Sequence, residues 1–184
     1  MNKKVALSVL FLLVLSCAAL VFADSNFRKL RGLLVGTQEV PVVMTSGHGT
    51  FDAAISKDET EITYELSYSD MQSTVSQAHI HVGQPNVNGG IVVWLCGNAS
   101  VTPPINPPAG TQACPPSGTI TGTITGANIV GPASQGVTTG EMAQLIEAIR
   151  DGNTYVNVHT AVSPGGEIRS QIGPDKGKNN HHGH

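Results

Sequence analysis

Polar and apolar residues alternate with a period of two along several short stretches of the chain. In residues 78–82, Ala78, Ile80 and Val82 fall on one side of an extended segment, and His79 and His81 fall on the other. Residues 155–160 and 167–172 alternate in the same way and are joined by a turn rich in glycine and proline. This pattern predicts one histidine-bearing strand and a C-terminal hairpin.

Alternation or short continuous apolar runs predict further strands elsewhere, and one stretch has the period of a helix. We expect strands over residues 33–35, 49–55, 62–68, 91–95 and 119–125. Met142, Leu145, Ile146 and Ile149 follow at helical spacing, which predicts one short helix over residues 139–151. Thr138 and Glu141 have the spacing of a capping box at its start.

These elements predict an all-β fold: a Greek-key β-sandwich of about eight strands with one short helix. The composition agrees, with 21 glycines, 11 prolines and only 12% charged residues, as expected for many turns between strands. We assign the domain to residues 33–173, preceded by a flexible arm over residues 24–32. Residues 174–184, which include His181, His182 and His184, are predicted to be a disordered tail rich in histidine.

The first 23 residues have the pattern of a secretory signal peptide. Lys3 and Lys4 precede an apolar run that ends in small residues at Ala23. An uncleaved anchor is the alternative, because the run is close to membrane-spanning length. We therefore expect a secreted or extracellular protein (periplasmic or on the cell surface in a bacterium) that meets a membrane only through this segment.

Charge and cysteine content narrow the classes of partner and compartment. The formal net charge is −3, and loss of Lys3 and Lys4 would make it more negative, which argues against nucleic acid as a partner. Cys96 and Cys114 would remain after cleavage, and an even count in an exported chain predicts one disulfide. Asn98 begins an Asn-Ala-Ser sequon and is a possible glycosylation site.

The histidines on the predicted strands are the main candidates for chemistry. Imidazole is a common ligand of copper and zinc, and His79 and His81 share a strand face to which His159 can add a third nitrogen. This predicts a copper or zinc ion on an exposed, polar sheet face. If His159 lies opposite Glu167, then Asn157 faces Arg169, and Glu167 can orient the His159 ring.

One alternative remains open from the residues alone. Asn157, Glu167, Arg169 and the histidines can instead form a hydrogen-bond network without metal, in a structural, adhesive or protein-interaction module with an extracellular protein partner. No nucleophile–base motif or phosphate loop is present, so no catalytic residue is assigned and an enzyme is the less favoured reading.

Several motifs in order resemble a known family, the CHRD domain. They are Gly36-Thr37-Gln38-Glu39-Val40-Pro41, Ala78-His79-Ile80-His81-Val82-Gly83, Asn88-Gly89-Gly90-Ile91-Val92, Tyr155-Val156-Asn157-Val158-His159-Thr160 and Pro164-Gly165-Gly166-Glu167-Ile168-Arg169. The resemblance implies a compact extracellular β domain without an assigned activity. The spacing of His79, His81 and His159 is also similar to the copper ligands of copper/zinc superoxide dismutase, although that enzyme's zinc-binding loop has no counterpart here. This similarity implies a second alternative, a superoxide-dismutase-like copper oxidoreductase.

Overall fold

The computed structural model describes residues 28–101 and 104–174, so the predicted leader and all but the first residue of the predicted tail lie outside the described residues. The described chain forms eight strands, one α-helix and three short 3₁₀ helices. They are β1 (Lys29–Val35), η1 (Gly36–Gln38), β2 (His48–Ile55), β3 (Ile62–Ser69), β4 (Val75–Val82), β5 (Gly90–Gly97), β6 (Gly118–Ile124), η2 (Gly126–Asn128), η3 (Ala133–Gln135), α2 (Met142–Arg150), β7 (Thr154–Thr160) and β8 (Ile168–Pro174).

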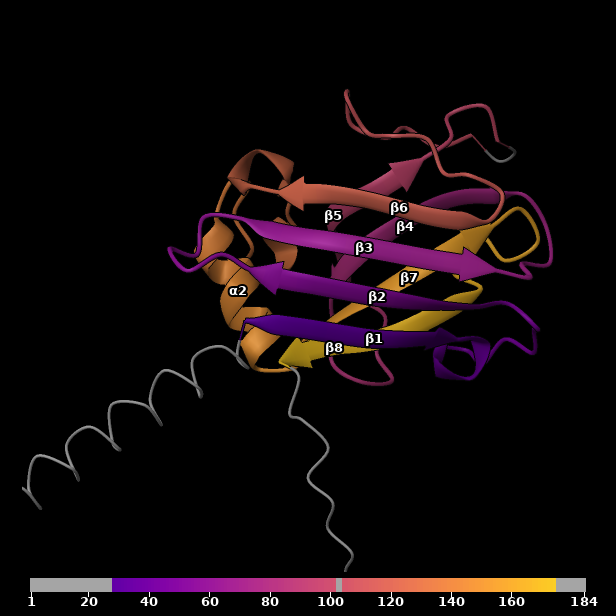
Figure 1. Ribbon diagram of the computed structural model, residues 1–184, viewed down its shortest axis with the longest axis horizontal. Helices are drawn as coiled ribbons and strands as arrows, with labels where there is room; N and C mark the ends of the chain where they lie inside the picture. The colour runs from indigo at the N-terminus through magenta and orange to yellow at the C-terminus, as the bar shows by residue number, and fades with distance from the viewer. Residues whose placement is uncertain (1–27, 102–103, 175–184) are drawn as a thin grey trace, which may run out of the picture.

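All eight strands belong to one antiparallel sheet with the order β5-β4-β7-β8-β1-β2-β3-β6. Figure 1 shows how this sheet folds into two layers, with β1, β2, β3 and β6 in front of β4, β5, β7 and β8. The predicted all-β class, with eight strands and one short helix, is confirmed. The two layers of the expected sandwich are halves of a single curled sheet.

The sheet is nearly closed into a barrel at its two edge strands. An isolated bridge joins Val93 of β5, one edge strand, to Ile129 in the segment that follows β6, the other edge strand. The Tyr64 hydroxyl also donates to the carbonyl of Leu95 at 3.2 Å, from β3 across to β5. These contacts connect the two edges of the sheet, which in an open sheet are free to pair with another chain.

Apolar side chains from both layers fill the space between them. Phe51 and Leu66 from the front layer and Ile80, Val156 and Ile168 from the back layer are all 1% exposed or less. Helix α2 covers one end of this core with an apolar face that includes Leu145, Ile146 and Ile149 (Figure 1). The alternation read from the sequence therefore assigns the inward face correctly on these strands.

Two local predictions are wrong. β1 begins at Lys29 and pairs with β2, so the arm predicted over residues 24–32 is strand in its last four residues. The predicted capping box does not form either: Glu141 is the N-cap of α2 and its side chain makes no cap bond. Instead, the backbone N–H of Thr138 donates to the side-chain oxygen of Gln144 at 2.8 Å. A side chain from the helix thus accepts the hydrogen bond of a backbone donor in the turn before it.

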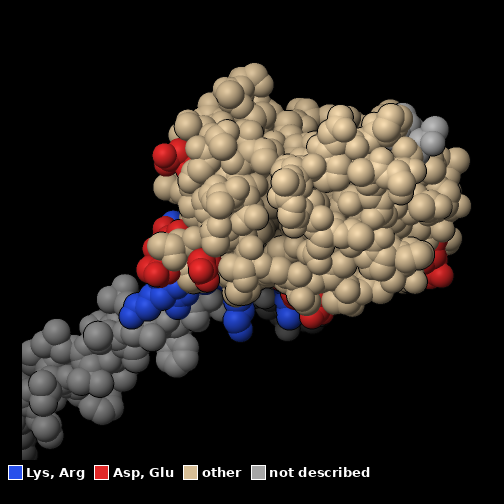
Figure 2. Space-filling model, turned by 90° about the horizontal axis from the view of Figure 1, so that it is seen from above, with Lys and Arg blue, Asp and Glu red and all other residues tan. Residues whose placement is uncertain are grey.

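Charged side chains are sparse on the described surface. The face seen in Figure 2 is almost free of Lys, Arg, Asp and Glu, which gather at its margins. No helix in the described part of the chain is long and apolar enough to cross a membrane.

Candidate metal site

Three histidines from two neighbouring strands form one cluster. His79 and His81 alternate on β4, and β7, which carries His159, pairs directly with β4. The ring centroid of His79 lies 5.3 Å from that of His81 and 5.0 Å from that of His159. One nitrogen from each ring can be chosen so that all three lie within 4.8 Å of one another, a spacing that one ion can bridge.

The main chain fixes the orientation of two of these rings. The Nδ1–H of His81 donates to the carbonyl of Gly89 at 3.0 Å, and the Nδ1–H of His159 donates to the carbonyl of Pro164 at 3.0 Å. A carbonyl can only accept, so each ring carries its proton on Nδ1 and presents a lone pair at Nε2. Hydrogen bonds of this kind are what hold metal-binding histidines in protein sites.

Two nitrogens of the cluster have no hydrogen-bond partner among the described residues. They are Nε2 of His79 and Nε2 of His81, and both are buried. Nδ1 of His79 lies 3.2 Å from Nε2 of His159. Buried polar atoms are rarely left without a partner, because desolvation costs about 1–3 kcal/mol for each one. The donor set therefore fits a cation that is coordinated by neutral imidazole nitrogens.

The predicted exposure of this face is wrong. His79, His81 and His159 are 0%, 7% and 5% exposed, and every residue of β7 is buried. The sheet alternates as expected, but the polar face is covered by the loop of residues 83–89, which supplies the Gly89 carbonyl, and by the segment around Pro164. The cluster is thus an enclosed site outside the apolar core.

Burial keeps the three imidazoles neutral. It lowers the pKa of His81 to about 4, an effect opposed in part by its hydrogen bond to Gly89. Burial, with a smaller contribution from His81, also lowers the pKa of His159 to about 4. The pKa of His79 is lowered further by burial and by its two histidine neighbours. At neutral pH all three nitrogens are therefore available as ligands.

The register predicted for the C-terminal hairpin is found, but the expected role of Glu167 is not. Asn157 pairs with Arg169 across β7 and β8, as the pattern predicts. The Glu167 carboxylate, however, accepts hydrogen bonds from Thr45 at 2.7 Å, Thr160 at 2.6 Å and the backbone of Gln72 at 2.9 Å. Its fully buried oxygens tie three segments together, and the carbonyl of Pro164 takes the place beside His159.

Arg169 holds the covering loop (residues 83–89) in place over the site. Its side chain is 1% exposed, and its guanidinium lies 3.4 Å from the centre of the Tyr155 ring, which in turn stacks on His81. The guanidinium also donates to Asn88, Gln84 and Val87 of the covering loop. Arg169 therefore acts on the loop that carries the Gly89 carbonyl, at some remove from the metal-binding nitrogens.

Asn157 lies beside the histidines, and Glu39 lies beside Asn157. Oδ1 of Asn157 lies 2.9 Å from Nε2 of His159. Glu39 is 4% exposed and its Oε1 has no hydrogen-bond partner among the described residues. Burial raises the pKa of Glu39 to about 7, although the charge of Arg169 and the amide of Asn157 act in the opposite direction. Sequence reasoning missed Glu39, which is far from the histidines along the chain.

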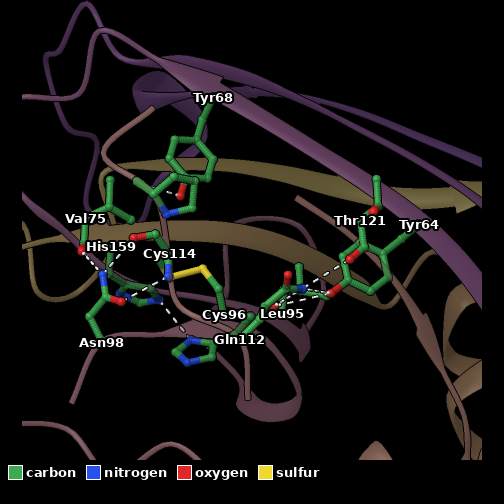
Figure 3. Close-up of a disulfide and its surroundings, with 12 residues drawn as sticks. Tyr64, Tyr68, Val75, Leu95, Cys96, Asn98, Gln112, Cys114, Thr121 and His159 are labelled. Atoms are coloured by element: carbon green, nitrogen blue, oxygen red, sulfur yellow. Dashed lines mark hydrogen bonds between the residues drawn. A yellow bond between two sulfur atoms is a disulfide. The ribbon is translucent and has the colours of Figure 1, made fainter. Parts of the chain in front are cut away.

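The predicted disulfide between Cys96 and Cys114 is present (Figure 3). Asn98 lies beside it and uses its whole side chain: Nδ2 donates to Val75 and to Cys114 at 2.9 Å each, and Oδ1 accepts from the backbone of Cys114 at 3.0 Å. Both hydrogens of Nδ2 are engaged, so a glycan on this nitrogen would displace at least one of these bonds. Glycosylation of Asn98 stays a prediction from the sequon.

Fold and site together define a disulfide-bonded, all-β domain with an enclosed three-histidine cluster. The family model of the CHRD domain matches residues 30–172, which is most of the chain. The protein therefore belongs to the CHRD domain family, as the motifs indicate. Comparison with curated proteins and with solved structures gave no match.

Proposed function

We propose that this is an exported CHRD-domain protein that holds a copper or zinc ion at His79, His81 and His159 in a non-catalytic role. The observation that carries the proposal is that Nε2 of His79 and Nε2 of His81 are buried and lack a hydrogen-bond partner among the described residues, in a cluster whose three rings each offer one nitrogen within 4.8 Å of the others. Neutral imidazoles suit both metals, and the two Nδ1–H bonds to main-chain carbonyls support Nε2 coordination by His81 and His159.

The enclosed position of the cluster favours binding over catalysis. A substrate would need direct access to the ion, whereas the three side chains are at most 7% exposed beneath the covering loop. The Cys96–Cys114 disulfide favours an oxidising compartment, in agreement with the predicted signal peptide. A site of this kind can carry a metal ion or stabilise the domain outside the cytosol.

A hydrogen-bond network without metal, in an interaction module with an extracellular protein partner, is the second candidate. The bonds of Glu167 and Arg169 to surrounding segments favour it. Its weakness is that a complete network would satisfy the histidine nitrogens, and two of them have no partner in the described part of the chain. The copper oxidoreductase alternative needs an access route in addition, and superoxide turnover by the copper-loaded chain above that of free copper would support it.

The test is the metal content of a chain that begins at Asp24, ends at residue 174 and carries no affinity tag. Deleting the tail removes His181, His182 and His184, which can bind metal on their own. After loading with copper or zinc and extensive dialysis, we expect elemental mass spectrometry to find about one equivalent of metal per chain. A content below about a tenth of an equivalent for both metals would overturn the proposal.

Two single substitutions locate the ion. His81→Asn keeps a side-chain N–H that can donate to Gly89 but removes the ligand nitrogen, so we expect metal binding to be lost. His48→Asn is the matched control, because His48 is exposed on β2 and is not part of the cluster. Equal metal content in both variants would place the ion elsewhere.

A further inference from the structure

The side chain of Asn157 brings its amide oxygen close to a ring nitrogen of His159, and both atoms are hydrogen-bond acceptors. The His159 ring carries its proton on Nδ1, where it donates to Pro164, so Nε2 presents a lone pair. Oδ1 of Asn157, also an acceptor, lies only 2.9 Å from that nitrogen. As assigned, neither atom carries a proton, so neither can donate to the other, and a cation at this point would convert a repulsion between acceptors into shared coordination.

Glu39 lies behind this amide. A methyl group added to Gly166 would stand 2.3 Å from Oε1 of Glu39 and 2.8 Å from Nδ2 of Asn157, so the carboxylate and the far side of the amide meet over one glycine. Gly166 has a φ of +126°, a conformation that glycine adopts readily. The absence of a side chain at this position is what lets the two groups reach the same point.

The charges around the cluster make Glu39 the carboxylate that can balance the charge of a bound ion. Three neutral imidazoles add no negative charge, and the buried guanidinium of Arg169 adds a positive charge close to the cluster. A divalent ion in such a place is unfavourable unless an anion compensates it. The described residues include two buried carboxylates, and Glu167 is held by Thr45, Thr160 and Gln72, which leaves Glu39.

We propose that Asn157 and Glu39 complete the metal site: Oδ1 of Asn157 is an oxygen ligand, and Glu39 is the buried counter-charge that makes the site select a divalent ion. This inference rests on the proposed three-histidine site. A carboxylate attracts a divalent ion about twice as strongly as a monovalent ion at the same distance. The pair thus decides which ion the histidines hold.

The test compares Zn²⁺ with Cu⁺, two closed-shell ions that both bind imidazole. The affinities for both ions are measured on the chain of residues 24–174 by competition with chromogenic chelators. The Cu⁺ measurements are made under anaerobic conditions. Glu39→Gln keeps the shape of the side chain and removes its charge. We expect the ratio of Zn²⁺ affinity to Cu⁺ affinity to fall at least tenfold, while Glu65→Gln, an exposed acid on β3, leaves the ratio unchanged.

A charge rescue separates this role from a merely structural one. Asn157→Asp in the Glu39→Gln background returns one carboxylate to the site, and we expect it to restore most of the preference for Zn²⁺. Asn157→Asp alone should raise the ratio above that of the wild type, and this comparison serves if Glu39→Gln does not fold. Urea unfolding of each metal-free variant monitors folding independently of metal.

The outcomes distinguish the two proposals. An equal loss for both ions in Glu39→Gln, no loss, or a failed rescue would overturn the role of Asn157 and Glu39 while the three-histidine site stands. A wild-type chain that binds Cu⁺ but no divalent ion would also overturn the role of Asn157 and Glu39. A wild-type chain that binds neither ion would overturn the proposed function itself, and this inference with it.

Discussion

At the scale of single residues, burial and main-chain hydrogen bonds together prepare the histidines as ligands. The carbonyls of Gly89 and Pro164 fix the tautomers of His81 and His159, and desolvation keeps their rings neutral. Glu39 is affected in the opposite sense, because burial raises the pKa of a carboxyl group. These shifts make the stability of the metal-free protein depend on pH.

We expect the metal-free protein to be less stable at pH 5 than at pH 7.5. In the unfolded chain histidine binds a proton below about pH 6.5. In the folded chain His81 and His159 do so only near pH 4, so between these values the unfolded state binds more protons and acid favours it. The cost is about 2 kcal/mol per histidine at pH 5.

Glu39 offsets part of this dependence. Its folded pKa of about 7 exceeds the unfolded value of 4.5, so its contribution to stability grows as pH falls through 7 towards 4.5. With three histidines against one carboxyl, we expect a net loss of about 3 kcal/mol, measured by urea unfolding in the presence of a chelator. His81→Asn should reduce the loss by about 2 kcal/mol, and an unchanged loss in that variant would contradict this assignment.

At the scale of elements, the site depends on strands β4, β7 and β8 and on the loop of residues 83–89 that covers them. Arg169 of β8 joins these parts, through its stacking on Tyr155 of β7 and its bonds to Gln84, Val87 and Asn88. A planar guanidinium can stack on a ring with its face while its five N–H groups donate around its edge, whereas an ammonium group has no flat face and only three donors. The loop carbonyl that orients His81 is therefore held in place by a residue of another strand.

We expect Arg169→Lys to lower the free energy of unfolding by about 3 kcal/mol, because the buried acceptors of the loop lose partners. Metal affinity should fall about 10- to 100-fold, as it does when the residues that orient ligands are changed. Arg31→Lys is the control: Arg31 pairs with Asp52 on the exposed surface, where the change should cost under about 1 kcal/mol. Chemical denaturation and chelator competition measure both quantities, and similar losses in the two variants would contradict the role of Arg169.

The period-two pattern was sufficient to predict β4, β7, β8 and the register that aligns Asn157 with Arg169, because strand geometry is local. It was not sufficient for the burial of His79, His81 and His159 or for the partner of Glu167. These depend on which distant segments return over the sheet, as Thr45 and Gln72 do to reach Glu167. Glu39 joins the site through the same long-range folding, and nothing in its local sequence indicates this.

At the scale of the whole molecule, one sheet encloses the core and its two edges must be held together. The strand order ends at β5 and β6, and an isolated bridge joins Val93 of β5 to Ile129 in the segment that follows β6. The Cys96–Cys114 disulfide links β5 to the segment before β6, and Gln112 in that segment donates to the Leu95 and Thr121 carbonyls, on β5 and β6 (Figure 3). The disulfide thus reinforces the least paired part of the sheet.

Replacing both cysteines with alanine should lower the free energy of unfolding by about 3 kcal/mol, the value expected for a closed loop of about this length. The cross-link joins residues 18 positions apart. Metal affinity should change less than threefold, because β4 keeps its pairing with β7 and the histidine rings keep their main-chain bonds. Urea unfolding and chelator competition on the same sample measure the two effects. A large loss of affinity with the fold intact would mean that the histidine cluster depends on closure of the barrel edge, and that strands β4 and β7 alone do not determine its geometry.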